Sequence, residues 1–328
     1  MRTISVKFML IVSIFIIFLF SLSFIGCKKD QTPTGLGNTG TAQWIQTNGP
    51  PGSTVVSFAV SDSNLFAGTS GSGVFLSTNN GDSWISVNTG LTNYYVHALA
   101  VSGKNLFAGT FGGVFHSTNN GNSWEATNTG LTDTYVHALS FSGTNLIAGT
   151  GGGLTHGGVF LSTNNGISWV SVYTTDSSDT FVYSLVVSDT NFFAGTNLGR
   201  VFFSTNNGTS WTGVNTGMTN PDVFALALSG MNLFAGTYGR GIFLSTNNGT
   251  SWAAINTGLT NTYVYALAVS GTNLFAGTDG DGVFLSTNNG TSWNSISIGL
   301  KSNNAFAFLV SGSNLFVGTE TGVWRRQL

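Results

Sequence analysis

Charged residues are scarce in this chain: only 7% of its 328 residues are Asp, Glu, Lys or Arg, and the net charge is −2. The body carries no run or stripe of Lys and Arg, so we expect no nucleic-acid partner, because such binding depends on clustered positive charge. Cys27 is the only cysteine, which excludes an intrachain disulfide. The four prolines leave the strand-like segments uninterrupted, as expected of a sheet protein.

Glycine, with 45 residues, and phenylalanine, with 26, are abundant instead, and both recur in a repeat. The octapeptide Ser-Thr-Asn-Asn-Gly-x-Ser-Trp occurs six times and ends at Trp84, Trp124, Trp169, Trp211, Trp252 and Trp293. Its spacing of roughly 41 residues is typical of β-propeller blades. A second marker, Asn-Leu-Phe-Ala-Gly-Thr and close variants, occurs seven times, so one repeat lacks its octapeptide.

Trp44 accounts for the missing octapeptide. The segment around it, residues 42–49, reads like residues 82–89 at the end of a repeat, and the last residues of the chain, from Gly322 through Trp324, read like a third strand. Joining the two ends completes a seventh unit and removes exposed sheet edges. The sequence therefore predicts an all-β, seven-bladed β-propeller of four-stranded blades over residues 41–328, closed by an N-terminal strand that completes the last blade.

One repeat illustrates the predicted blade, with strands over 96–101, 105–110, 113–117 and 123–127. The first three are apolar on both faces, as expected of a sheet packed between two neighbouring sheets. The fourth is more polar, which is typical of an outer rim. The Asn-Gly of each octapeptide is a strong hairpin signal and predicts a tight turn between the third and fourth strands.

The octapeptide resembles the Asp-box, Ser-x-Asp-x-Gly-x-Thr-Trp, of the bacterial neuraminidase (BNR) repeat. That repeat occurs in sialidases, some endoglucanases, sortilin-type receptors and photosystem assembly factors, where the box is a structural hairpin remote from the active face. Every copy here has Asn at the Asp position, namely Asn79, Asn119, Asn164, Asn206, Asn247 and Asn288. This removes the carboxylate that a calcium ion would prefer. The resemblance implies a structural role for the octapeptides, in a lipoprotein-anchored, non-catalytic member of the family.

The N-terminus indicates export from the cytoplasm. Two positive charges within residues 1–7 precede an almost continuously apolar segment over 8–26, which is typical of a secretory leader or a single anchor helix. Residues 23–26 before Cys27 resemble a bacterial lipobox, with Phe24 where Leu is usual. That resemblance implies a lipoprotein signal peptide over 1–26 and lipidation of Cys27. The alternative is an uncleaved anchor helix with an unmodified cysteine.

Residues 27–40 contain three glycines and several polar residues, which predicts a flexible tether. Together these features predict a protein of the bacterial cell envelope, held by lipid at the outer membrane or cell surface. Its contact with the membrane would run through the lipid at Cys27 alone.

Departures from the repeat indicate where a binding site lies. The loops between second and third strands share one face with the blade-to-blade connections, opposite the octapeptide turns, and we call this the variable-loop face. The candidate ligand-binding residues there are Arg200, Asp222, Tyr238, Arg240, Asp279, Asp281 and Glu320. The alternative is that these charges only keep a glycine-rich surface soluble. The face also carries Tyr94, Tyr95, Tyr135 and Tyr263, and tyrosines suit neutral carbohydrate or protein surfaces.

Catalysis is the second hypothesis for this face. The resemblance to sialidases implies a need for three arginines, a Tyr nucleophile paired with Glu, and an acid Asp, but only Arg200 and Arg240 face the right way. A glycosidase with an acid and a base needs two carboxylates across a groove, and Asp222, Asp279, Asp281 and Glu320 supply candidates. No long insertion builds a cleft, so we assign no catalytic residue.

Histidines raise the question of a metal. His97 and His137 occupy equivalent positions in adjacent first strands and, with His156, would supply three zinc ligands. Aromatic residues at the same position of other repeats favour packing around a central channel instead, so we expect neither a metal nor a cofactor. We interpret the chain as a monomeric binding or scaffold module for glycans or envelope proteins; the alternative is an Asp-box glycoside hydrolase, sialidase- or endoglucanase-like.

Overall fold

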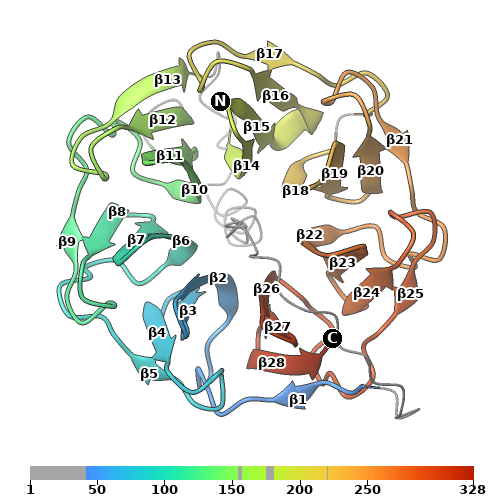
Figure 1. Cartoon of the computed structure of the whole chain (residues 1–328), viewed down its shortest axis with the longest axis horizontal. Helices are drawn as coiled ribbons and strands as arrows, with labels where there is room; N and C mark the ends of the chain where they lie inside the picture. The colour runs from blue at the N-terminus through green and yellow to red at the C-terminus, as the bar shows by residue number, and fades with distance from the viewer. Residues whose placement is uncertain (1–41, 154–156, 175–180, 220) are drawn as a thin grey trace, which may run out of the picture.

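The computed structural model describes residues 42–153, 157–174, 181–219 and 221–328. These residues form seven four-stranded antiparallel sheets, arranged as the blades of a propeller around a central axis (Figure 1). The predicted seven-bladed, all-β fold is confirmed. Across the ranges just given, no helix combines the length and the apolar character that spanning a bilayer requires.

Six blades run outward from the axis in chain order, and the seventh runs from β26 through β27 and β28 to β1 (Figure 1). The first strands are β2 (Val55–Ser61), β6 (Val96–Ser102), β10 (Val136–Ser142), β14 (Val182–Ser188), β18 (Val223–Ser229), β22 (Val264–Ser270) and β26 (Ala307–Ser311). The second strands are β3 (Asn64–Thr69), β7 (Asn105–Thr110), β11 (Asn145–Thr150), β15 (Asn191–Thr196), β19 (Asn232–Thr237), β23 (Asn273–Thr278) and β27 (Asn314–Thr319). We number the blades one to seven in this order.

The third strands are β4 (Val74–Ser77), β8 (Gly113–Ser117), β12 (Gly158–Ser162), β16 (Val201–Ser204), β20 (Gly241–Ser245), β24 (Val283–Ser286) and β28 (Gly322–Gln327). The fourth strands are β5 (Ile85–Ser86), β9 (Glu125–Ala126), β13 (Val170–Thr174), β17 (Thr212–Gly213), β21 (Ala253–Ala254), β25 (Asn294–Ser295) and β1 (Ile45–Gln46). A short 3₁₀ turn, η1 (Asn197–Gly199), follows β15.

The fourth strand of blade two is shorter than predicted. In blade two the expected strand over 123–127 is reduced to β9, two residues long. The reason is that Trp124 bonds to the previous blade rather than to its own third strand. Its backbone N–H donates to the Thr89 carbonyl at 2.9 Å, and its indole Nε1 donates to the Val87 carbonyl at 2.8 Å. Trp124 therefore joins blade two to blade one.

The octapeptide turn is held by side chains of the repeat itself. In blade one, Ser77 Oγ donates to Asn79 Oδ1 and accepts from the Gly81 N–H, both at 2.9 Å. Asn79 Oδ1 also accepts from the Ser83 N–H at 3.0 Å, while Asn79 Nδ2 donates to Ser83 Oγ at 2.9 Å. Asn80 adopts a left-handed conformation with φ of 54°, which Asn tolerates better than most residues. Both ends of the Asn79 amide are thus used, so Asn serves where an Asp-box has a carboxylate.

The N-terminal strand closes the ring as predicted. Strand β1 pairs with β28 in blade seven, with Gln46 opposite Trp324. Trp44 is buried, and its indole Nε1 donates to the Ile296 carbonyl of blade six at 2.8 Å. On the other side, the Trp84 indole of blade one donates to Thr47 Oγ1 at 3.2 Å. Residues 44–47 therefore connect three blades.

Close packing between blades explains the glycine of the Asn-Leu-Phe-Ala-Gly-Thr marker. A Cβ atom at Gly109 would lie 2.6 Å from Val136 Cγ1 in the next blade, which no real carbon contact allows. The first strand of each blade thus packs against the second strand of the blade before it. This close approach brings the first strands into a tight ring around the axis.

Candidate functional site

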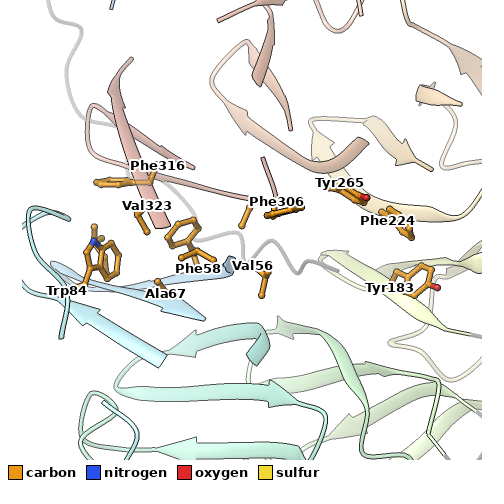
Figure 2. Close-up of a cluster of buried hydrophobic side chains, with 13 residues drawn as sticks. Val56, Phe58, Ala67, Trp84, Tyr183, Phe224, Tyr265, Phe306, Phe316 and Val323 are labelled. Atoms are coloured by element: carbon orange, nitrogen blue, oxygen red, sulfur yellow. The ribbon is translucent and has the colours of Figure 1, made fainter. Parts of the chain in front are cut away.

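One residue of each blade, next to the start of its first strand, lines the central axis. These residues are Val56, His97, His137, Tyr183, Phe224, Tyr265 and Phe306, and all are buried. Rings on adjacent blades contact one another, with centroid separations from 5.1 Å for Tyr183–Phe224 to 6.0 Å for His97–His137. Figure 2 shows Tyr183, Phe224, Tyr265 and Phe306 following one another along this lining. The predicted packing of aromatic rings around the channel is confirmed.

The two histidines of this ring are held neutral. Burial, and then the neighbouring His137, lowers the pKa of His97 to about 3. Burial lowers the pKa of His137 to about 4, although its ring lies in a hydrogen bond with the Gly151 carbonyl at 2.7 Å. A carbonyl only accepts, so His137 Nε2 carries the proton and Nδ1 does not. Both nitrogens of His97 and Nδ1 of His137 are buried without a partner in the described structure.

The structure gives no metal centre in the part it describes: no three His, Cys, Asp or Glu side chains there are placed to hold an ion. His156, the third histidine of the zinc hypothesis, lies outside the described residues. Phe111 covers His97 instead, with the two rings stacked at 4.3 Å. His97 and His137 therefore serve as aromatic packing groups.

The variable-loop face has the predicted arrangement. The loop between the second and third strands of one blade pairs with the connection that enters the next blade, as in the antiparallel bridges of Ser70 with Tyr95 and of Tyr238 with Tyr263. The same pairing joins Asp279 to Asn304. These loops and connections thus surround the mouth of the channel on the side opposite the octapeptide turns.

Three of the predicted site residues come together at this mouth. Tyr238 is 47% exposed, and its ring lies 4.7 Å from Tyr263 and 5.3 Å from Phe224 of the channel lining. Its phenol pKa is raised, first by partial burial and then by Tyr263 and the carboxylates of Asp279 and Asp222. Two carboxylates from adjacent blades therefore act on one exposed aromatic ring.

Asp279 is tied to the channel lining. The Tyr265 hydroxyl donates to Asp279 Oδ2 at 3.2 Å. Burial first, and then the Asp279 carboxylate, raises the pKa of Tyr265 far above its usual value, so its phenol stays protonated. Asn261 Nδ2 donates to the backbone carbonyl of Asp279, which fixes the loop. The carboxylate is thereby held in place beside Tyr238.

The remaining predicted residues divide into two kinds. Asp281 accepts a hydrogen bond from Thr260 Oγ1, and Glu320 accepts one from Ser302 Oγ at 2.7 Å. Each of these carboxylates ties its loop to the connection that enters the same blade, so it already has a packing role. Arg200, just after η1, and Arg240, beside Tyr238, are exposed. Their guanidinium groups form no ion pair within the described residues.

A second aromatic group lies over blades two and three. Phe111 stacks between Tyr95 at 5.7 Å and Tyr135 at 4.9 Å, and the two tyrosines are 47% and 38% exposed. The residue type of Phe111 gives no reason to select it, because phenylalanine occurs 26 times in the chain and most of these residues are expected in the core. The signal was available in its position, since Phe111 occupies the loop site that holds Tyr238 in blade five.

Comparison by sequence finds no matching family model and no matching curated protein. Solved structures do match. YCF48 bound to D1 peptide has a TM-score of 0.71 at 14% identity, covering 89% of this chain and 98% of that one. The extracellular domain of BT4673 from B. thetaiotaomicron has a TM-score of 0.70 at 19% identity, covering 88% of this chain. An ancestral GH74 enzyme has a TM-score of 0.69 at 23% identity, covering 86% of this chain.

The chain spans 40% of the BT4673 structure and 46% of the GH74 structure, so each of those proteins is more than twice as extensive as the match. At these identities the likeness shows the β-propeller fold alone. The class that fold and site define is a seven-bladed β-propeller with an aromatic and acidic patch at one mouth of its channel.

Proposed function

We propose that the protein is a binding module that holds a glycan or an envelope protein on its variable-loop face. The observation that carries this proposal is the convergence of exposed Tyr238 with Asp222 and Asp279 at the one face where the repeats differ. The octapeptide face, by contrast, presents nearly the same turn in successive blades. It therefore has few side chains that a ligand could recognise specifically. Exposed aromatic rings and arginines are the residues that dominate binding energy at protein interfaces.

The alternative of glycoside hydrolysis receives less support from the site. A glycosidase of the usual kind needs an acid and a base placed on either side of a bound sugar. Asp281 and Glu320 are engaged by Thr260 and Ser302, and Asp279 is engaged by Tyr265. Structures of similar fold include a peptide complex and an enzyme, so the fold by itself favours neither function.

We further propose that residues 1–26 are removed, that Cys27 is lipidated and that residues 27–40 form a tether in the cell envelope. These residues lie outside the described structure. The described chain begins at Ala42, which lines a cavity of about 470 Å³ with Asn273 and Gln327. Asn273 begins a second strand and Gln327 ends a third strand, so Ala42 lies at the octapeptide side.

Replacing Cys27 with Ser tests the anchor. We expect the Cys27→Ser protein to lose metabolic palmitate labelling and to leave the membrane fraction, because the only thiol that can carry lipid is gone. The measurement compares labelled wild type and variant expressed in the same bacterial cells. Labelling that persists in the variant would refute lipidation at Cys27.

Replacing Tyr238 and Arg240 together with Ala tests the binding face. A ligand is first found by screening the full-length protein, in detergent, against glycan arrays and envelope extracts. We expect the double variant to bind it about 1–3 kcal/mol more weakly in calorimetry, because an aromatic anchor and an arginine are both lost.

The control for this experiment belongs on the octapeptide face. Asp82 is unsuitable, because it forms an ion pair with Arg325 of blade seven at 2.7 Å and helps to close the ring. Asn122 holds the equivalent position in blade two and is exposed, so Asn122→Ala is the matched change. If Asn122→Ala weakens binding while the Tyr238 and Arg240 change does not, the functional face is the opposite one.

A further inference from the structure

The mouth of the channel has two chemically different sides. The side over blades two and three carries the stacked rings of Tyr95, Phe111 and Tyr135. On the side over blades five and six, the same loop and connection positions carry Tyr238, Tyr263, Asp222 and Asp279, which we call the tyrosine–aspartate patch. The carboxylate of Asp133, two residues before Tyr135, is buried, so the two sides offer a ligand similar aromatic area but different accessible charge.

The tyrosine–aspartate patch combines exposed rings with carboxylates. Tyr238 and Tyr263 meet edge to face at 4.7 Å and are 47% and 40% exposed. Asp222 and Asp279 are half-buried. The Tyr238 N–H donates to the Asp222 carbonyl at 2.9 Å, and the Asp279 N–H donates to the Tyr263 carbonyl at 3.0 Å, so the backbone places both aspartates next to the two tyrosines. Arg240, further along the same loop, forms no ion pair with Asp279 in the part of the chain that the structure describes.

The negative charge of the tyrosine–aspartate patch favours a positively charged ligand over a neutral or an acidic one. A guanidinium or ammonium group near an aromatic face is attracted to the electron-rich ring, and more strongly when partly desolvated. Half-buried carboxylates add attraction, because the effective dielectric constant there is lower than in water. A neutral sugar can donate hydroxyl hydrogen bonds to the two carboxylates but carries no charge for them to attract, and an acidic segment is repelled by them.

We propose that the tyrosine–aspartate patch binds a lysine or arginine side chain of a protein partner. This inference rests on the proposed function and narrows its ligand from a glycan or protein to a basic protein segment. The partner side chain lies against Tyr238 and Tyr263 while its charge faces Asp222 and Asp279. Arg200 and Arg240, on the same face, are left to pair with acidic groups of the partner.

The experiment uses blocked tetralysine as the probe, with blocked tetraglutamine and cellotetraose as neutral comparisons. Binding to the full-length protein in detergent is measured by calorimetry at low and at physiological salt. Asp222→Asn with Asp279→Asn removes both charges, and the chain itself holds Asn at the equivalent positions, Asn304 and Asn197, so the fold tolerates the change. Asp62→Asn with Glu125→Gln removes two exposed charges elsewhere and is the matched control.

We expect tetralysine to bind wild type more tightly than either neutral probe, and more weakly as salt rises, because salt screens the attraction. The Asp222 and Asp279 change should weaken that binding by about fivefold or more, whereas the control pair should leave it within about twofold. Tyr238→Ala should also weaken it, and Tyr135→Ala, on the side of the mouth where the carboxylate of Asp133 is buried, should not.

Two results would overturn the inference. The first is that tetralysine fails to bind the wild-type protein, or that it binds the aspartate variant as tightly as the wild type. The second is that a neutral saccharide binds in a way that depends on Tyr238 but not on the aspartates. The variable-loop face would then still be a binding face, but its ligand would be a glycan. Failure of the proposed function is a different result, in which the Tyr238 and Arg240 change affects no ligand found by screening.

Discussion

Deleting residues 41–50 is expected to lower the melting temperature of the protein by about 10 °C. The deletion removes the buried Trp44, with its bond to the Ile296 carbonyl, and the pairing of β1 with β28. It also removes Thr47, the hydrogen-bond partner of the Trp84 indole in blade one. Blade seven is left with an exposed edge, and its contacts with blades one and six are weakened.

Two point variants refine this prediction, and differential scanning calorimetry measures all three proteins. Trp44→Ala should reproduce most of the loss, since replacing a buried Trp with Ala costs about 3–5 kcal/mol. Ile45→Ala is the matched control, because Ile45 lies next to Trp44 but is 64% exposed. A melting temperature that the deletion leaves unchanged would show that residues 41–50 do not close the ring.

The protein is expected to lose stability as the pH falls below about 6.5, through the two channel histidines. Their folded-state pKa values, about 3 for His97 and about 4 for His137, lie below the ordinary value of 6.5. The unfolded chain therefore takes up protons first as the pH falls. The stability they contribute is fully present above pH 6.5 and is lost as the pH approaches their folded values. For His137 alone the loss is on the order of 3 kcal/mol at pH 4.

The repeat supplies the variant that tests this prediction. Changing His97 to Phe and His137 to Tyr installs side chains found at the same position in other blades, Phe224 and Tyr183. The free energy of unfolding in urea, measured at pH 7.5 and at pH 4.5, should fall with acid much less in the double variant than in wild type. Burial raises the pKa of Asp133, so that residue acts in the opposite direction, but it is common to both proteins.

A histidine outside the channel serves as the control. His116 lies on the third strand of blade two, where four other blades carry Leu, and burial lowers its pKa also. It is only half-buried, so His116→Leu should change the acid sensitivity less than the channel variant. Equal loss of stability with acid in wild type and in the channel variant would contradict the assignment to His97 and His137.

The propeller itself could be predicted from the sequence because its signals are local and repeated. Asn-Gly turns, strands that are apolar on both faces and a period of roughly 41 residues each act within one blade. Closure could also be predicted, since Trp44 and Trp324 mark the two parts of one divided blade. The anchor at Cys27 rests on sequence alone and remains a prediction. The later start of the fourth strand in blade two could not be predicted, because Trp124 bonds to Thr89 in the neighbouring blade.

The contacts within the candidate site could not be predicted from the local sequence pattern. The sequence placed Arg200, Asp281 and Glu320 on the same face as Asp222, Tyr238 and Asp279. The structure sets Asp222 and Asp279 beside Tyr238, and bonds Asp281 to Thr260 and Glu320 to Ser302. Residues that meet at the mouth come from different blades or from loops many residues apart. Their contacts depend on how neighbouring blades pack against one another. The repeat is nearly the same in every blade, so its sequence does not indicate which loop residues will meet.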